Sequence, residues 1–239
     1  MTLRQLLLVD LETSGLDPAK DCPVEAAWAV YSLEHRTLLH AHSWLVDPRS
    51  YRGDAIENIR DLSSVHKITP AMWEESGMPW ASVERMVAKT SGRVDAIVAH
   101  NASFDRRWFR DEAIQAKPWI CTLNGVRWPE AGKSRRLGDI ALEHGVAVID
   151  AHRALPDVQT LARLLTMVAR LGHDVGAILE RGLRPTSVYV VADTDFDAAR
   201  NALAKEHGFA WVGDRKVWER TMADEDAAGL PFKVRRVAA

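Results

Sequence analysis

The stretch that decides the fold is Leu6-Leu7-Leu8-Val9-Asp10-Leu11-Glu12-Thr13, an apolar run that ends with two acidic residues. A short apolar run is typical of a buried strand, and side chains two positions apart on a strand project from the same face. The carboxylates of Asp10 and Glu12 would therefore repel each other, and residues 5–19 contain no Lys or Arg to neutralise them. One interpretation is that a divalent cation is the missing partner. The other is that the strand ends at Val9 and that both acids are hydrated loop residues.

The composition is that of a globular protein with room for one sizeable domain and a small one: 239 residues, 47% hydrophobic and 27% charged. No apolar segment approaches the roughly 20 residues that cross a bilayer, and an acid at position 10 comes too early for a secretory signal. We therefore expect a cytoplasmic protein with no membrane partner. Cys22 and Cys121 are isolated, which argues against a disulfide framework or a structural zinc site.

The overall charge is close to balanced. A formal net charge of -2 and a pI near 6.5 argue against a protein that coats duplex nucleic acid through its total charge. Local basic clusters can still bind phosphate, or they can be ordinary solvated faces. The three clusters are Arg106, Arg107 and Arg110; Lys133, Arg135 and Arg136; and Arg215, Lys216 and Arg220.

The first part of the chain predicts strands followed by helices. Strands over residues 4–10, 24–33 and 38–46, joined by short turns, indicate an antiparallel meander. The hydrophobic pattern then predicts helices at 54–62 and 80–90, strands at 96–99 and 118–121, and helices at about 136–144 and 155–171. Between the last two strands, Ser103 can serve as the N-cap of a helix that turns Phe104, Trp108 and Ile114 inward.

The helix predicted at 155–171 begins with an acid in its first turn. Pro156 suits the first helical turn, and a stripe at helical spacing predicts a core-facing side, formed by Val158, Leu161, Leu165 and Val168. Asp157 then lies where the helix dipole favours an anion. Dipole complementation alone would account for this acid, so its role depends on what else converges on it.

The last quarter of the chain predicts a second unit. Residues 172–185 (GHDVGAILERGLRP) contain three glycines and a proline, which favours a linker at about 176–185 between a domain at 1–175 and a small α+β domain at 186–239. In the small domain we expect a strand at 186–192, a helix capped by Thr194 and ended by Gly208, and a hairpin turning on Gly213-Asp214. Its aromatic residues can form a small core or, with the interleaved Arg215, Lys216 and Arg220, a stacking platform for single strands; these residues are Phe209, Trp211 and Trp218.

Three acidic motifs occur in order along the chain: DLETSGL at 10–16, HNASFD at 100–105 and HRALPD at 152–157. Together they resemble the DEDDh exonucleases, the 3′-to-5′ proofreading type found in the epsilon subunit of bacterial replicative polymerase. The segment VHKITP at 65–70 resembles the link segment of that family, with Lys67 where the family often has glycine, so the resemblance covers about residues 5–171. It implies a ribonuclease H-like fold, with a mixed five-stranded sheet flanked by helices.

The resemblance also implies a metal site and a general base. Asp10, Glu12, Asp105 and Asp157 would hold two divalent cations, Mg²⁺ or Mn²⁺, whose oxygen preference matches carboxylates. The cations would stabilise charge on the attacking and leaving oxygens of a phosphodiester. His152 would take the proton from the attacking water. The alternative for His152 is a surface or capping histidine.

Further residues are implied to contact the substrate. Two groups would face the terminal nucleotide: Thr13, Ser14 and Leu16 on one side, and His100, Asn101 and Phe104 on the other. Leu16 would act as an apolar wedge against the base, while Phe104 could equally belong to the core. Such a site would prefer single-stranded or frayed 3′ ends and would read the base sequence little.

The predicted function is a metal-dependent 3′-5′ exonuclease that releases nucleoside 5′-monophosphates from single-stranded DNA or RNA, in DNA proofreading or repair. An oligoribonuclease-like RNA exonuclease keeps the same site and differs only in substrate. A third hypothesis is a catalytically silent nucleic-acid-binding or polymerase-associated scaffold. The end of the chain carries no obvious clamp-binding peptide, so the sequence identifies neither a polymerase or repair partner nor an oligomeric state.

Overall fold

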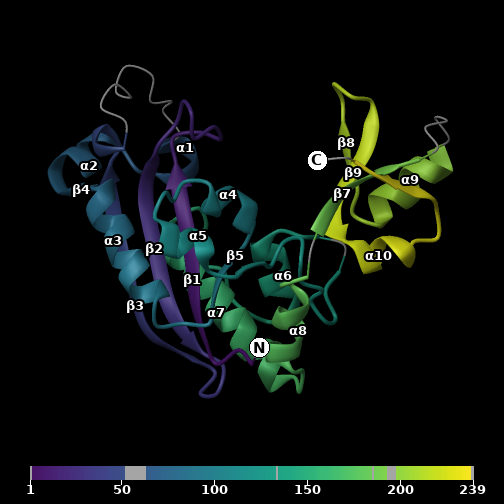
Figure 1. Cartoon of the computed structure of the whole chain (residues 1–239), viewed down its shortest axis with the longest axis horizontal. Coiled ribbons are helices and arrows are strands. Elements are labelled where there is room, and N and C mark those ends of the chain that lie inside the picture. Colours follow the sequence, from purple (N-terminus) through teal and green to yellow (C-terminus); the bar gives the residue numbers. More distant parts are fainter. Residues whose placement is uncertain (1, 52–62, 133, 185, 193–197, 238–239) are drawn as a thin grey trace.

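The structure is a computed structural model that describes residues 2–51, 63–132, 134–184, 186–192 and 198–237. It contains two sheets with helices around them, a larger one near the N-terminus and a smaller one near the C-terminus (Figure 1). The helix predicted at 54–62 and the N-cap predicted at Thr194 lie outside the described residues, as does Lys133.

The larger sheet has six strands in the order β4-β3-β2-β1-β5-β6. Strands β1 (Gln5–Thr13), β2 (Pro23–Ser32) and β3 (Thr37–Asp47) form the antiparallel meander that the sequence predicts. Strand β5 (Ala96–Ala99) pairs parallel to β1, and β6 (Trp119–Cys121) pairs parallel to β5. The mixed sheet is therefore confirmed, and a two-residue edge strand, β4 (Met78–Pro79), adds a sixth strand to the expected five.

Strand β1 continues through both acids and ends only at Thr13. The alternative in which the strand stops at Val9 is therefore wrong. Leu6, Leu7 and Leu8 are completely buried, and their alternation along the strand divides the domain into two cores. Leu6 and Leu8 belong to one core and Leu7 belongs to the other.

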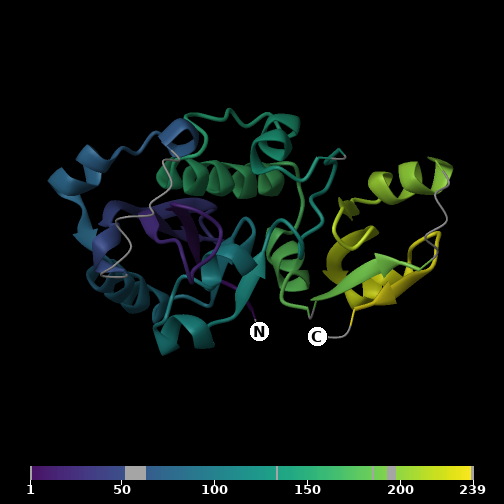
Figure 2. The same cartoon turned by 90° about the horizontal axis from the view of Figure 1, so that it is seen from above.

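A helix layer covers each face of the larger sheet (Figure 2). On one face α7 (Ala154–Arg170) packs against β1 and β2 and buries the predicted stripe of Val158, Leu161, Leu165 and Val168. On the other face α3 (Trp80–Ser91) packs Val83 and Val87 together with Trp28 and Trp108. The shorter helices of this unit are η1 (Pro48–Ser50), α1 (Ser63–His66), α2 (Pro70–Ser76), α4 (Ala102–Arg106), α5 (Glu112–Ala116) and α6 (Leu137–Glu143). No helix in the described ranges is both long and apolar enough to span a bilayer.

The turn from β5 into α4 differs from the prediction. Helix α4 begins at Ala102, and its N-cap is Asn101, in the left-handed conformation with φ of 85°. Ser103 lies inside the helix and donates its hydroxyl hydrogen to Asn101 Oδ1 at 3.1 Å, so its prediction as N-cap is wrong. Asn tolerates this backbone conformation better than most residues, which allows the chain to reverse sharply after the strand. Trp108 and Ile114 are buried as expected, although Ile114 belongs to the separate helix α5.

The segment expected to be a linker contains helix α8 (Val175–Arg181). The Asp174 side chain caps this helix by accepting a hydrogen bond from the Ala177 backbone N–H at 3.0 Å. Val175 and Leu179 are buried in the same core as α7. Gly172 and Gly182 therefore flank a packed helix that contains Gly176, and only residues 182–185 separate it from the next strand.

The smaller sheet has four strands in the order β10-β7-β9-β8 and confirms the α+β class of this unit. Its elements are β7 (Thr186–Val191), α9 (Ala198–Glu206), β8 (Ala210–Val212), β9 (Val217–Ala223), α10 (Asp224–Ala228) and β10 (Val234–Arg236). Phe209 is buried in its core and Trp218 packs against it, which favours the core interpretation of these aromatics. Trp211 is different, since 42% of its surface is exposed.

Candidate functional site

The acidic residues of the three motifs meet at one end of the larger sheet. Strand β1 projects Asp10 and Glu12 from one face, and the first turn of α7 brings Asp157 to the same place. One carboxylate oxygen from each of these three residues lies within 4.8 Å of the others. Chain segments almost 150 residues apart thus place like charges in near contact, in a partly buried position.

Asp105 completes the group from the side of α4. It is 2% exposed, and it is not one of the three residues whose carboxylate oxygens lie within 4.8 Å of one another. Its carboxylate accepts a hydrogen bond from the backbone N–H of Leu11, between Asp10 and Glu12 on β1. We call Asp10, Glu12, Asp105 and Asp157 the acid cluster.

The acid cluster holds protons more tightly than isolated carboxylates do. Burial, followed by the charges of Asp105, Glu12 and Asp157, raises the pKa of Asp10 well above its ordinary value. Burial and the charge of Asp157 raise the pKa of Glu12 to about 8, against the opposing effect of Arg153. Burial also raises the pKa values of Asp105 and Asp157. The cluster therefore lacks enough positive charge to keep all four groups ionised at neutral pH.

The donor atoms of the acid cluster fit hard divalent cations. All four side chains offer carboxylate oxygens, which are the ligands that Mg²⁺ and Mn²⁺ prefer, and the cluster contains no Cys or His that would favour a softer metal. Cations bound there would offset the repulsion that raises the pKa values. The residues present thus fit the group that the resemblance implies.

A buried ion pair next to the acid cluster was missed in the sequence. Glu25 on β2 lies directly opposite Glu12 and binds the Arg153 guanidinium through two hydrogen bonds of 3.0 and 2.7 Å. Glu25 also accepts from the Ala154 backbone N–H at 2.9 Å, at the start of α7. The available signal was a single acid inside the otherwise apolar strand VEAAWAV, because such a charge needs a partner.

His152 lies on the loop before α7 with an exposed side chain and a φ of 65°. Its backbone N–H donates to Asp157 Oδ2 at 3.3 Å, which places the residue beside the acid cluster. The loop is also tied to the link segment, since Lys67 Nζ contacts Asp150 Oδ1 at 2.6 Å. Lys67 itself has a φ of 60°, a conformation that glycine adopts more easily. Lys67, which stands where the family often has glycine, therefore occupies a position whose backbone conformation favours glycine. Its side chain forms the ion pair with Asp150.

The loop after β1 contains the first set of predicted substrate contacts. Thr13 and Ser14 are buried, and their hydroxyls form hydrogen bonds inside the loop: Thr13 Oγ1 donates to Gly15 O at 2.6 Å, and Ser14 Oγ accepts from the Cys22 N–H at 3.0 Å. Leu16 is 76% exposed. The structure thus uses Thr13 and Ser14 to shape the loop and presents Leu16 to solvent.

The second set lies at the end of β5. Both ring nitrogens of His100 are engaged, Nδ1 with Thr122 Oγ1 at 3.0 Å and Nε2 with the Arg135 carbonyl oxygen at 2.9 Å. Burial lowers the pKa of His100 to about 4, so the ring is neutral at physiological pH and joins β5 to the loop before α6. Phe104 is partly buried against Trp108, in an edge-on contact with ring centroids 5.8 Å apart. Asn101 forms the turn described above.

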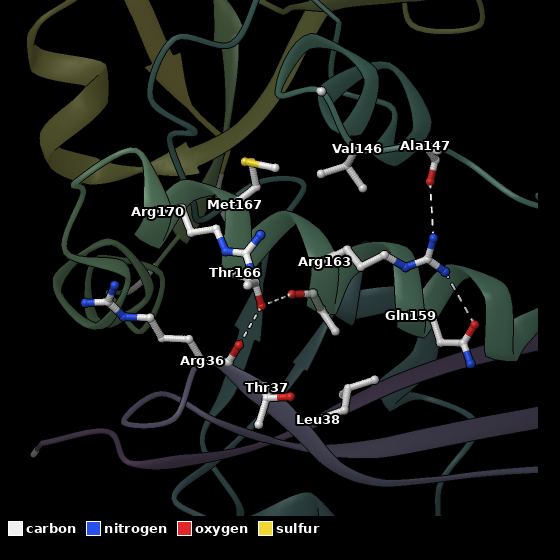
Figure 3. A pocket seen from close by; sticks show the side chains of 12 residues that line it. Arg36, Thr37, Leu38, Val146, Ala147, Gln159, Arg163, Thr166, Met167 and Arg170 are labelled. Carbon is white, nitrogen blue, oxygen red and sulfur yellow. Dashed lines mark hydrogen bonds between the residues drawn. The ribbon is translucent and has the colours of Figure 1, made fainter.

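Two cavities lie away from the acid cluster. The larger, of about 560 Å³, lies along α7 and is lined by Arg36, Arg163 and Arg170 together with apolar side chains that include Leu38 and Met167 (Figure 3). The smaller, of about 330 Å³, lies between the loop after β6 and the C-terminal unit. None of the four acids lines either cavity.

Comparison with known proteins gives similar structures and relatives. The solved structure of Exonuclease X in complex with 5′ overhanging duplex DNA is 26% identical and covers 74% of this chain and 99% of that chain, with a TM-score of 0.55. A zinc-bound complex of E. coli ExoI with single-stranded DNA is 16% identical and covers 85% of this chain and 50% of that chain, with a TM-score of 0.59, which supports the fold alone.

A curated relative is the PolC-type DNA polymerase III of Thermotoga petrophila, 25% identical over 178 residues. The match covers 71% of this chain, which spans only about 12% of the length of that relative. A domain family of unknown function, DUF8626, matches residues 192–237. The exonuclease family RNase_T matches residues 7–165, a span that includes the whole acid cluster and His152. Since this match covers well over half of the chain and agrees with the fold, the chain belongs to this exonuclease family.

Proposed function

We propose that the protein is a metal-dependent 3′-5′ exonuclease that releases nucleoside 5′-monophosphates from single-stranded DNA or RNA. The observation that carries the proposal is the convergence of Asp10, Glu12 and Asp157 within 4.8 Å, with Asp105 buried beside them. Family membership and the similarity to an Exonuclease X complex with DNA support nucleic acid as the substrate class.

The four acids are the proposed cation ligands. Two divalent cations, Mg²⁺ or Mn²⁺, would supply the positive charge that stabilises the attacking and leaving oxygens of the phosphodiester. Glu25 and Arg153 act as positioning residues, because their hydrogen bonds fix the start of α7 and hence Asp157. Asp105 is held against β1 by the Leu11 N–H. The side chains are thus held in place before the substrate arrives, which lowers the reorganisation that the reaction requires.

His152 is the proposed general base. Its side chain is exposed beside the acid cluster, and an imidazole can accept a proton near neutral pH. In the reaction the water gives its proton to this imidazole, the water oxygen bonds to phosphorus, and the bond to the 3′ oxygen of the preceding nucleotide breaks. The backbone hydrogen bond to Asp157 links the position of the base to that of a proposed ligand.

Two apolar side chains are proposed to contact the terminal nucleotide. Leu16 extends into solvent from the loop after β1, and Phe104 lies on α4 with the Arg107 guanidinium 4.9 Å from its ring centroid. Contacts of this kind tolerate any base, which is consistent with an exonuclease that removes successive nucleotides.

The second candidate keeps the site and changes the substrate. An oligoribonuclease-like enzyme would act on short RNA, and similarity to a solved structure of histone mRNA stem-loop recognition by a 3′-exonuclease, at 14% identity, supports only the shared fold. A catalytically silent scaffold is disfavoured because all four acids and His152 are present. Roles in proofreading or repair, with a polymerase as partner in the cytoplasm, stay predictions.

Digestion of oligonucleotides labelled at the 5′ end tests the proposal. With Mg²⁺ or Mn²⁺, we expect a ladder of products that shorten from the 3′ end, and no ladder in EDTA. Parallel DNA and RNA ladders, together with dinucleotides of each kind, distinguish the two enzyme candidates. A full-length strand that persists at saturating metal while binding is measurable would overturn the enzyme and favour the scaffold.

A further inference from the structure

The smaller cavity lies where the exonuclease domain meets the C-terminal unit. One wall is the loop after β6, between Thr122 and Arg135, and the other is formed by residues 206–208 and Arg220 of the C-terminal unit. Figure 2 shows this loop approaching the C-terminal unit near α9. Both units therefore contribute side chains to a single site of about 330 Å³.

Three arginines line this cavity, which we call the arginine cavity after Arg127, Arg135 and Arg220. Arg135 and Arg220 both reach Gly208, since Cδ of Arg135 and Nε of Arg220 lie 3.6 and 3.7 Å from the position that a Cβ would take there. Two guanidinium-bearing side chains, one from each unit, thus meet at the same glycine. Like charges brought to the same place repel each other, and an anion between them would offset this repulsion.

The two central arginines are held by neutral oxygens. Arg135 donates to the Leu123 carbonyl oxygen and to Asn124 Oδ1, and Arg220 donates to the His207 carbonyl oxygen at 2.7 Å. Within the described residues, neither forms an ion pair, and the buried Nε of Arg220 has no hydrogen-bond partner. These neutral oxygens orient the guanidinium groups without neutralising their charge.

Among the residues that line the cavity, the three arginines outnumber the carboxylates, since Glu206 is the one carboxylate in the described lining. Arg127 pairs with Asp226 at 3.2 Å, while Asp139 and Glu143 accept hydrogen bonds from Ser134 and Gly132 of the cavity wall. Burial lowers the pKa of Arg220, and the charges of Arg135 and Arg127 lower it further, against an opposing effect of Asp226. Because a guanidinium remains protonated in proteins, a bound anion would relieve this unfavourable environment.

The arginine cavity lies at the same end of the sheet as the acid cluster. Strands β1, β5 and β6 run parallel, so their carboxyl ends point the same way. Asp10 and Glu12 lie at the end of β1, Asp105 follows β5, and the cavity begins directly after β6. Two strand spacings separate the first and last of these positions, which is roughly 10 Å. A hydrogen bond to the Arg135 carbonyl oxygen ties His100, at the end of β5, to the loop that lines the cavity.

We propose that the arginine cavity binds backbone phosphates of a nucleic-acid strand upstream of its 3′ end. The proposal rests on the proposed function, because it takes the strand in the cavity to be the one that reaches the acid cluster. Guanidinium groups match phosphate oxygens through paired hydrogen bonds, whereas bases would need stacking surfaces or directed acceptors. The C-terminal unit thereby supplies Arg220 to a phosphate site that the exonuclease domain alone lacks.

The test compares Arg220→Gln and Arg127→Gln with the unmodified protein. Binding of a fluorescent dT12 strand is measured by anisotropy in EDTA over a range of salt concentrations, and cleavage of the dinucleotide dT2 is measured with Mg²⁺. Arg127 is exposed, so its variant keeps the test valid if Arg220→Gln does not fold. The matched control is Arg170→Gln, an exposed arginine on the larger cavity.

We expect each cavity variant to weaken dT12 binding about 5- to 20-fold. The slope of log affinity against log salt concentration should become shallower by about 0.7 for each phosphate that the variant no longer binds. Cleavage of dT2, which has no upstream phosphate, should change less than about twofold. Unchanged dT12 affinity in both variants overturns the proposal, as does an equal loss with Arg170→Gln or an equal loss on dT2. If the unmodified protein cleaves nothing while the arginine-dependent binding persists, the proposed function fails and the phosphate site stands.

Discussion

The acid cluster and the arginine cavity both concentrate like charges, and they differ in how they tolerate this. The acids hold protons, as the pKa of about 8 at Glu12 shows, so the cluster can become less charged when no cation is bound. The guanidinium groups cannot lose their charge in this way, and carbonyl oxygens of neighbouring loops hold them instead.

This difference shows which kind of ligand each region would respond to. The acid cluster would exchange protons for cations, so its occupancy would depend on pH as well as on metal concentration. The arginine cavity would exchange small anions for phosphates, so its occupancy depends on salt concentration. Substitutions in and around the acid cluster, and a change of pH, can therefore test this difference between the two regions.

The largest effect is expected from Asp10→Asn, which removes one charge from the centre of the acid cluster. We expect the rate of Mg²⁺-dependent cleavage to fall by about 10³-fold or more, because cation binding and charge stabilisation are both lost. Thermal stability without metal should stay the same or rise, because a repelling charge is gone. Cleavage is measured on a labelled strand, with Asp214→Asn in the exposed hairpin as the matched control. A rate within tenfold of normal would contradict the assignment of Asp10.

His152→Ala should have the next largest effect. We expect kcat to fall by about 10²-fold, while metal affinity changes less than about twofold, because the proposed role is proton transfer and not ligation. The control is His35→Ala, another exposed histidine on a loop. Equal rates for the two variants would contradict the role as general base and would favour a surface or capping role for His152.

Glu25→Gln tests the ion pair between Glu25 and Arg153 that lies next to the acid cluster. The Glu25 side chain is 3% exposed and that of Arg153 is 25% exposed, so removing the carboxylate leaves a largely buried guanidinium without its partner. We expect a loss of about 2 to 4 kcal/mol in unfolding free energy and a fall of about tenfold in kcat/KM. The matched measurement is a double-mutant cycle with Arg153→Gln. Additive losses would show that the two residues act independently and would contradict the positioning role.

The smallest effect is a dependence of thermal stability on pH in the absence of divalent cations. Burial raises the pKa of Glu12 from 4.5 to about 8, so the folded protein binds more protons than the unfolded chain between these values. Stability should therefore fall as pH rises through this range, lowering Tm by a few degrees. Mg²⁺ should flatten the curve and the substitution Glu12→Gln should make it shallower, whereas Arg220→Gln should leave it unchanged. A Tm that rises with pH over this range would contradict the raised pKa.

Much of the larger domain could be predicted from local pattern. The alternation in Leu6-Leu7-Leu8 and the helical stripe of Val158 and Leu165 follow directly from which face is buried, and the structure confirms both. The approach of Asp157 to Asp10 and Glu12 could be inferred only through the family resemblance, since nothing local specifies contacts between distant segments.

What was missed depends on tertiary context. Helix α8 is short and flanked by glycines, and its stability comes from burying Val175 and Leu179 in a core that local sequence does not reveal. Asn and Ser are about equally preferred as N-caps, so residue preference could not choose between Asn101 and Ser103, and the sharp left-handed turn after β5 decided it. The pairing of Glu25 with Arg153 joins residues 128 positions apart, so spacing gave no indication of it.

The packing of α8 also sets the reach of the C-terminal unit. Gly182 lies against the same core, since a Cβ there would lie 2.8 Å from Ile120 Cγ2, and Leu183 packs against that core as well. The Arg184 backbone N–H donates to the Arg181 carbonyl oxygen, so few residues lie between α8 and the start of β7 at Thr186. The connection formed by residues 182–185 spans at most about 14 Å when fully extended. It would therefore keep Arg220 at a high effective concentration near the exonuclease domain. Lengthening the connection after Arg184 with Gly and Ser would leave the packing of Leu183 in place while diluting one half of the arginine cavity relative to the other.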